Sequence, residues 1–129
     1  MAPTPPLKIK IQIYCGDEIA MGPGKADLLD AIREHGSISA AGRALGMSYR
    51  RAWLLVDAMN RCWKDRLVDT VPGGGQTRGA RVTDVGEAIL SAYRSMQKAT
   101  GRAASPIMFQ ELDALLLAEP MPVDGTPTS

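Results

Sequence analysis

Isoleucine occupies every second position from residue 9 to residue 13, with polar side chains at the positions between. This period of two predicts a strand over residues 9–13 with one apolar face. A turn at residues 15–17 would lead into a second short strand over residues 18–21, which Gly22-Pro23-Gly24 ends. The N-terminal part of the chain is therefore predicted to form a β-hairpin that lays its isoleucines against a core.

The spacing of apolar residues then changes to three and four, the period of an amphipathic helix. This pattern predicts three helices, over residues 25–35, 39–45 and 49–63. Gly36 is placed to end the first helix in a left-handed conformation, and either Ser37 or Ser39 can cap the second. Gly46 supplies a tight turn before the third helix, which Ser48 can cap. The second and third helices therefore form a helix-turn-helix.

The third helix has an apolar face and a polar face. Its core-facing stripe comprises Ala52, Leu55, Val56, Met59 and Trp63. Trp53 is also expected in the core, because tryptophan is highly buried on average. The opposite face receives Arg50, Arg51, Leu54, Asp57 and Arg61. Small residues in the second helix let the second and third helices cross closely.

A short hairpin and two more helices complete the pattern. Strands over residues 67–71 and 80–83 flank a loop at 72–79 with four glycines, the position of a wing. A long helix over residues 83–100, capped by Thr83, is followed by a break at residues 101–106 and an amphipathic helix at 107–117. The fold class is thus mainly α with small β, a winged helix-turn-helix with an N-terminal β-hairpin. The expected divisions are residues 7–100 for this domain, 101–119 for a C-terminal amphipathic element, and 1–6 and 120–129 for disordered tails.

The last two helices carry more apolar surface than the end of a small domain needs. Dimerisation through them would bury this surface and set two reading helices about one DNA turn, or a multiple of it, apart. In the alternative, these helices fold back onto their own domain. The candidate dimer contacts are Ile89, Tyr93, Met96, Leu112, Leu115 and Leu116.

Charge is unevenly distributed along the 129 residues, whose net charge is only +1. Residues 33–81 hold nine basic against four acidic side chains, which concentrates positive charge on the helix-turn-helix and wing. This distribution favours duplex DNA as the partner. In the alternative interpretation, these arginines merely solvate helix faces.

The first turn of the third helix is the part that normally reaches base edges in a helix-turn-helix. A guanidinium there can donate two hydrogen bonds to guanine or clamp a phosphate. Ser48 can act as a helix cap or a phosphate ligand, and Tyr49 can contact a phosphate or pack its ring under the helix. The candidate DNA contacts are Ser39, Ser48, Tyr49, Arg50, Arg51, Gln76, Thr77, Arg78 and Arg81.

Other classes of function find less support. No apolar run reaches the roughly 18 residues that a membrane helix needs, and no secretory signal opens the chain, so we expect a cytoplasmic protein. Cys15 and Cys62 are interpreted as reduced thiols, with Cys62 packed, and no metal site is predicted. His35, the sole histidine, has no evident nucleophile or carboxylate pair, so an enzyme is not expected. The glycine loop lacks the Lys-Ser/Thr ending of a P-loop.

Several short motifs, taken together, resemble the ModE family of molybdate-responsive transcriptional regulators. The matching residues are Leu28-Leu29, Gly36-Ser37-Ile38-Ser39, Ser48-Tyr49, Ala52-Trp53, Met59-Asn60, Leu67-Val68, Gly73-Gly74-Gly75, and Val82-Thr83 with Gly86. The likeness covers residues 7–97, and the GSIS and SYxxAW patterns are fairly specific to this family among LysR-like winged helices. It implies a homodimer that binds a palindromic operator and governs genes of molybdate uptake or molybdenum enzymes.

The resemblance also implies a difference in sensing. Family members carry paired molybdate-binding modules after this domain, whereas residues 101–129 contain no Ser-Ala-Arg-Asn-type oxyanion motif. We therefore expect no cofactor and no molybdate binding by this chain alone. Two alternatives stay open: a different effector bound at the dimer interface, and a winged helix reused as a protein-interaction adaptor.

Overall fold

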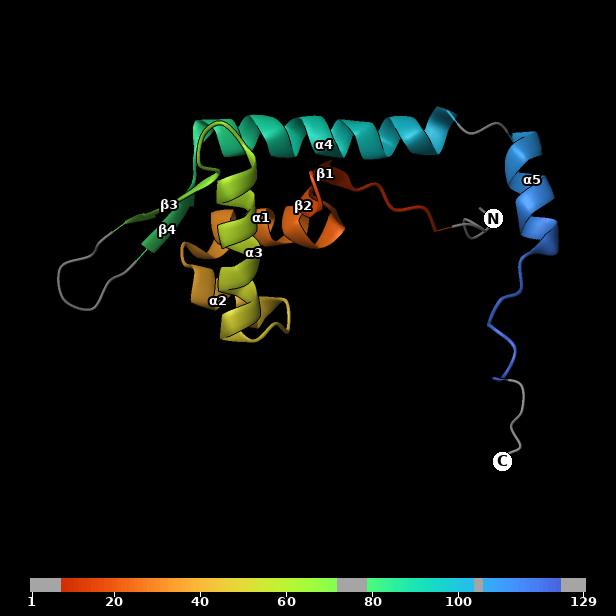
Figure 1. Cartoon of the computed structure of the whole chain (residues 1–129), viewed down its shortest axis with the longest axis horizontal. Coiled ribbons are helices and arrows are strands. Elements are labelled where there is room, and N and C mark those ends of the chain that lie inside the picture. The colour runs from red at the N-terminus through yellow and green to blue at the C-terminus, as the bar shows by residue number, and fades with distance from the viewer. Residues whose placement is uncertain (1–7, 72–78, 104–105, 124–129) are drawn as a thin grey trace. The chain divides into compact units, whose positions relative to one another are not determined.

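The computed structural model describes the backbone of residues 8–71, 79–103 and 106–123. Residues Lys10–Ala99 form one unit, and Met1–Ile9 together with Thr100–Ser129 form a second. The elements, labelled in Figure 1, are β1 (Ile13–Cys15), β2 (Glu18–Met21), α1 (Pro23–His35), α2 (Ile38–Ala44), α3 (Tyr49–Cys62), β3 (Val68–Val71), β4 (Gly79–Val82), α4 (Asp84–Ala103) and α5 (Pro106–Leu115). Their order and the two antiparallel hairpins confirm the predicted winged helix-turn-helix.

The first hairpin is shorter than predicted. β1 begins at Ile13, so the predicted strand over residues 9–13 is wrong except at its last residue. The carbonyl of Ile11 instead accepts a hydrogen bond of 2.7 Å from the hydroxyl of Tyr93 on α4. Ile11 and Ile13 do pack against the core, as the alternation indicated. The prediction failed for the backbone pairing, because the Ile11 carbonyl bonds to a side chain of α4 and not to a neighbouring strand.

α1 begins at Pro23, two residues before the predicted start. Proline is well suited to the first helical position, where its missing N–H leaves no bond unmade. The helix ends at Gly36 with φ 75°, which confirms the predicted left-handed end. The cap of α2 is Ser37 and not Ser39, since the Ser37 hydroxyl accepts a bond of 3.0 Å from the amide of Ala40.

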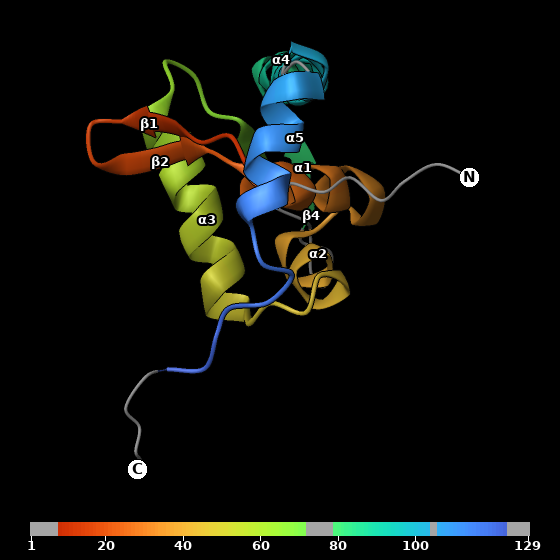
Figure 2. The ribbon, with the colours of Figure 1, turned by 90° about the vertical axis from the view of Figure 1, so that its right-hand side faces the viewer.

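α2 and α3 cross as closely as the small residues predicted. A Cβ added at Gly42 would lie 2.9 Å from the Cβ of Ala52, so neither position has room for a larger side chain. Gly46 forms the turn with φ 73°, and the Ser48 hydroxyl accepts a bond of 3.1 Å from the amide of Arg51. Figure 2 shows α3 beside α1 and α2, with the β1–β2 hairpin near its C-terminal end.

The core of the first unit draws on every helix from α1 to α4. Its buried residues include Met21, Leu28, Leu29, Ile32, Ile38, Ala52, Val56, Met59, Leu67, Val68, Leu90 and Tyr93. The predicted stripe of α3 is confirmed, with Leu55 and Trp63 half-buried at its edge. The core prediction for Trp53 is wrong, because 38% of its surface is exposed. Trp53 lies one turn before Asp57, on the side of α3 that faces solvent.

Asn60 joins α3 to the start of β3. Its side-chain oxygen accepts bonds of 2.9 Å and 3.1 Å from the amides of Leu67 and Val68, and its nitrogen donates to the Val68 carbonyl at 3.1 Å. One side chain thus satisfies three backbone groups of a buried segment. The prediction of strands flanking a wing holds for β3 and β4, which pair from Val68–Val82 to Val71–Gly79.

The same segment fixes the start of α4. The Thr83 amide donates to the Leu67 carbonyl at 2.9 Å, and the Thr83 hydroxyl accepts from the Gly86 amide at 3.0 Å, which confirms Thr83 as the cap. A Cβ added at Gly86 would overlap the carbonyl oxygen of Leu67 and lie 2.7 Å from Val82 Cγ1. Gly86 is therefore required by close approach of two backbones.

Ion pairs also hold α4 against α1. Arg94 lies 2.6 Å from Asp30 and 3.0 Å from Asp27, and Arg33 lies 2.7 Å from Glu87. Burial disfavours the charge of Arg94, but the hydrogen bonds that its guanidinium donates to Asp30 and Asp27 outweigh this effect and raise the pKa of Arg94. Figure 1 shows α4 running along the side of the domain above α1.

The second unit differs from its prediction at one boundary. α4 continues through Gly101 to Ala103, so the predicted break at Gly101 is wrong. A single glycine costs a helix only about 1 kcal/mol, which is too little to end it. α5 is close to the predicted helix at 107–117, and residues 1–6 and most of the wing loop lie outside the described residues. Among the helices described, none is both long and apolar enough to cross a membrane.

Gly86→Ala should lower the free energy of unfolding by about 2 to 3 kcal/mol, because the new methyl group has to displace the Leu67 backbone. Gly101→Ala in the same helix is the matched control, since no described atom lies within 4 Å of the added methyl group. We expect it to raise the free energy of unfolding by roughly 0.5 to 1 kcal/mol. Urea denaturation measures both. Equal effects of the two substitutions would contradict the close approach.

Asn60→Ala should lower the free energy of unfolding by about 2 to 3 kcal/mol, because three backbone groups lose their partner. Asn60→Asp keeps an acceptor for the amides of Leu67 and Val68 and loses only the donor, so its loss should be smaller. Thermal and urea unfolding would measure both variants. If Asn60→Asp lowered the free energy of unfolding as much as Asn60→Ala does, the side-chain oxygen of Asn60 would not be important as an acceptor.

Candidate nucleic-acid interface

The N-terminal end of α3 is an exposed cationic tip. Ser48, Tyr49, Arg50 and Arg51 are all exposed there, in the order that the sequence predicted. The free amides of the first turn add the partial positive charge of a helix N-terminus. Neither Arg50 nor Arg51 lies within ion-pair distance of a carboxylate on the described residues. Both guanidiniums are thus available to an anionic partner.

Helical spacing separates the two arginines. Arg50 shares its face with Trp53, Leu54 and Asp57, at i+3, i+4 and i+7, and all of these are exposed. Arg51 lies on the flank, in line with the half-buried Leu55. Arg50 therefore projects from the centre of the exposed face, and Arg51 from its edge.

Arg61, the third arginine of α3, is held by carboxylates. Its guanidinium lies 2.8 Å from Asp57 and 3.4 Å from Glu18 on β2. The hydrogen bond and charge of Asp57, with a smaller contribution from Glu18, raise the pKa of Arg61. The cationic character of the exposed face is thus greatest at its N-terminal end, and Arg61 serves to join α3 to the hairpin.

Apolar side chains accompany the cationic tip. The rings of Tyr49 and Trp53 meet edge to face, with centroids 6.1 Å apart and planes at 61°. Leu54 is 55% exposed and Tyr49 63% exposed. The exposure of Trp53 was missed because the residue type suggested burial. Its position four residues after Tyr49, on the face of Arg50, is the signal that could have placed it.

The wing contributes one described candidate. Arg81 lies on β4 opposite Asp69, and these side chains approach to 3.6 Å, as do those of Asp69 and Arg66. The backbone of β4 is anchored to the end of α1, because the Ala80 amide donates to the Gly36 carbonyl at 2.8 Å. The candidates Gln76, Thr77 and Arg78 lie outside the described residues. Ser39 is half-buried in the first turn of α2.

The predicted dimer contacts occupy different environments. Tyr93 is 1% exposed within its own unit, so its ring is enclosed by its own chain and not available to a second one. Ile89 packs at the edge of the same core, whereas Met96 is 44% exposed on α4. Leu112, Leu115 and Leu116, in the second unit, are exposed.

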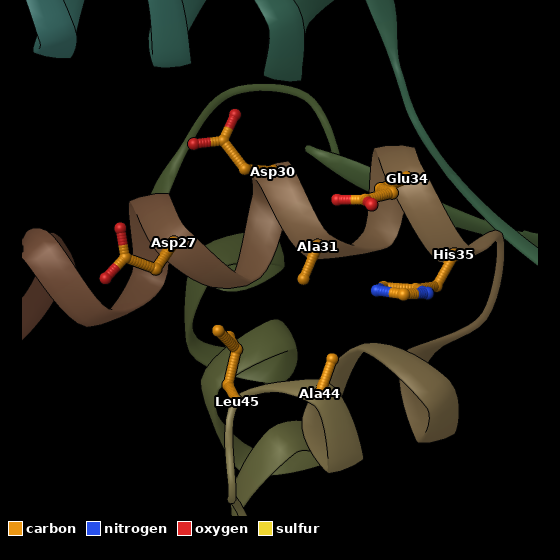
Figure 3. Close-up of a pocket in the computed structure, with 7 residues that line it drawn as sticks. All are labelled: Asp27, Asp30, Ala31, Glu34, His35, Ala44 and Leu45. Carbon is orange, nitrogen blue, oxygen red and sulfur yellow. The ribbon is translucent and has the colours of Figure 1, made fainter.

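A hollow of about 330 Å³ lies between α1 and the end of α2. It is lined by Asp27, Asp30, Ala31, Glu34, His35, Ala44 and Leu45. In Figure 3 the imidazole of His35 lies in the gap between the two helices, while the carboxylates of Asp27 and Asp30 point away from it. Those two carboxylates accept hydrogen bonds from the guanidinium of Arg94. The acidic side chains that line the hollow therefore do not point at a common position where they could bind one ligand.

Both cysteines lie near the junction of the hairpin with α3. Cys15 is exposed and Cys62 half-buried, so the packing prediction for Cys62 holds in part, and both thiols are free. Burial, with a contribution from the neighbouring Cys15, raises the pKa of Cys62. Burial likewise lowers the pKa of Lys25 on α1, against the opposing charges of Cys62 and Glu18. Among the described residues, no group of three or more His, Cys, Asp or Glu side chains is arranged to hold a metal ion.

Part of the chain is similar to known proteins. Residues 25–87 match the family described as bacterial regulatory helix-turn-helix protein, lysR family. The solved full-length LysR-type regulator LysG of Corynebacterium glutamicum, with bound effector Arg, aligns with a TM-score of 0.48 at 28% identity. That alignment covers 64% of this chain and 27% of LysG.

Curated relatives include three proteins with names linked to molybdenum or ModE. The molybdenum-pterin-binding protein MopB of Rhodobacter capsulatus is 40% identical, over 66% of this chain and 32% of its own length. MopA of the same organism is 36% identical, over 64% of this chain and 31% of its own length. The DNA-binding transcriptional dual regulator ModE of Escherichia coli K12 is 31% identical, over 67% and 32%.

The chain spans about a third of the length of these relatives. The matched part contains α1 to α3, the wing strands and the start of α4, which is the part that positions the cationic tip. Residues 25–87 are therefore a lysR-type helix-turn-helix, and the chain carries the helix-turn-helix domain of a ModE-type transcriptional regulator.

Proposed function

We propose that this chain binds duplex DNA through the N-terminal end of α3 and regulates transcription. The observation that carries the proposal is the pair of exposed, carboxylate-free arginines at the tip of the second helix of a lysR-type helix-turn-helix. In such motifs this end of the helix enters the major groove. The close crossing at Gly42 and Ala52 fixes the angle at which α2 presents α3.

The two arginines have separable roles in this proposal. Arg50, at the centre of the exposed face, can donate two hydrogen bonds to O6 and N7 of a guanine. Arg51, at the edge, is better placed to meet a phosphate, as are the hydroxyls of Ser48 and Tyr49. The wing, with Arg81 and the candidates at residues 76–78, would contact the backbone of the neighbouring groove. No step of this function is catalytic.

We further propose that the protein acts as a homodimer on a palindromic operator. Met96 is exposed on α4, and the small residues Ala88, Ala92 and Ala99 are exposed with it. A second α4 could lie against this side of the helix at short distance. A two-fold axis there would repeat the α3 tip, as a palindromic site requires. Leu112, Leu115 and Leu116 are exposed in the second unit and stay candidate dimer contacts.

The genes controlled are proposed to concern molybdenum, because relatives of the domain are named molybdenum transport protein ModE and molybdenum-pterin-binding protein. Molybdate binding is not part of the proposal for this chain alone. A second candidate, a winged-helix adaptor for another protein, would also use exposed surface on α3. The unpaired arginines favour DNA over the adaptor, because they match a dense array of phosphates.

Replacing both Arg50 and Arg51 with alanine should weaken binding to a mixed-sequence DNA duplex at least about tenfold. Each lost phosphate contact should also reduce the dependence of log affinity on log salt by about 1. Fluorescence anisotropy between low and moderate salt measures both quantities. Arg61→Ala is the control, because Asp57 and Glu18 already hold that side chain. Affinity unaffected by the double substitution would favour the adaptor.

Met96→Glu should convert the dimer into a monomer, because two buried carboxylates would face each other across the α4 contact. Lys98→Glu is the control, since Lys98 is exposed and lies two residues after Met96, about 160° around the helix from it. Sedimentation velocity distinguishes the two states. A wild-type chain that sediments as a monomer at micromolar concentration would refute this contact.

A further inference from the structure

The exposed face of α3 carries a cluster of large apolar side chains. Leu54 and Trp53 are exposed, and Tyr49 meets Trp53 edge to face. Figure 2 shows α1 and α2 along one side of α3. Polar side chains usually occupy this side of an amphipathic helix. A single exposed leucine needs no explanation, but this leucine lies beside an unpaired arginine and two aromatic rings.

The position of Leu54 is specific. It follows Arg50 by four residues, so the two side chains lie on one face about 5 to 6 Å apart at their Cβ atoms. Successive bases on a DNA strand are about 3.4 Å apart along the axis. Two side chains at this spacing can reach base pairs one or two steps apart in one groove. A base pair next to the one that Arg50 contacts is therefore within reach of Leu54.

The chemistry of the group that binds beside this face follows from the side chains of Arg50 and Leu54. The guanidinium of Arg50 requires hydrogen-bond acceptors or negative charge, and Leu54 requires an apolar group beside them. In the major groove the apolar group on a base edge is the C5-methyl of thymine, and guanine presents paired acceptors. A DNA site with thymine next to the base read by Arg50 supplies both.

We infer that Leu54 is a specificity-determining residue that reads the C5-methyl group of a thymine in the operator. The inference rests on the proposed DNA-binding function and adds to it the chemical group that is recognised. Leu54 contacts the methyl group, and Arg50 contacts the adjacent base pair. The edge-to-face pair of Tyr49 and Trp53 forms the other side of Arg50 and restricts where that side chain can lie.

The test removes the methyl group and the leucine separately. A high-affinity duplex is first selected from a randomised pool with the wild-type chain. Each thymine is then replaced, one at a time, by deoxyuridine, which lacks only the C5-methyl group. Dissociation constants for every duplex are measured with the wild type, with Leu54→Ala, and with the control Leu45→Ala, which truncates another exposed leucine outside α3.

At one thymine in each half-site, deoxyuridine should weaken wild-type binding about fourfold, the factor that corresponds to one buried methyl-sized group. Leu54→Ala should bind the thymine and deoxyuridine duplexes equally at that position. Leu45→Ala should retain the wild-type difference. Circular dichroism melting checks that each variant is folded, as expected for substitutions at exposed positions.

The outcomes separate the inference from the function on which it rests. If the wild-type chain selects a duplex but no thymine is sensitive, or if Leu54→Ala keeps the sensitivity, the inference is overturned and the DNA-binding function stands. If the wild-type chain selects no duplex and shows no salt-dependent binding, both are overturned. The apolar cluster would then be assigned to a contact with another protein.

Discussion

The contact on which most of the arrangement depends is the close approach of α4 to the backbone of Leu67. The Leu67 amide is bonded to Asn60, its carbonyl to the Thr83 amide, and Gly86 leaves room for both backbones. Three segments of the chain therefore meet at one residue that is fully buried. Because backbone groups cannot change rotamer, this meeting point fixes α3, β3 and α4 more tightly than side-chain packing alone.

This rigidity bears on the proposed binding of DNA by a dimer. In the proposed dimer, the distance between two α3 tips depends on how each α3 is held relative to its own α4. The ion pairs of Arg94 and Arg33 add a second set of links between α4 and α1, on which α2 packs. In that proposal, a domain that bent at the Leu67 junction would change the distance between the two α3 tips, and contacts far from the DNA would set the half-site spacing.

The sequence predicted the elements whose evidence is local. The helical periods, the turn at Gly46 and the caps at Ser48 and Thr83 depend on neighbouring residues, and the structure confirms them. The strand at residues 9–13 failed because its partner, Tyr93, lies on a helix far along the chain. The role of Asn60 was not foreseen, because a side-chain amide that bonds the backbone of Leu67 and Val68 leaves no periodic pattern in the sequence. In the candidate site, the exposure of Arg50 and Arg51 was predicted from their position, whereas the exposure of Trp53 was missed because residue type was weighed above helical phase.

Charge pairing in the fold leaves fewer arginines of residues 33–81 without a carboxylate neighbour than the sequence alone could indicate. Residues 33–81 hold a large excess of positive charge, yet several of its arginines have carboxylate partners in the fold. Those with partners are Arg33, Arg61, Arg66 and Arg81. Among the described arginines of this segment, Arg43, Arg50 and Arg51 have no carboxylate within ion-pair distance, and they lie at the end of α2 and the start of α3. The field available to a phosphate surface is therefore concentrated around the turn of the helix-turn-helix, where Ser48 and the first amides of α3 add to it.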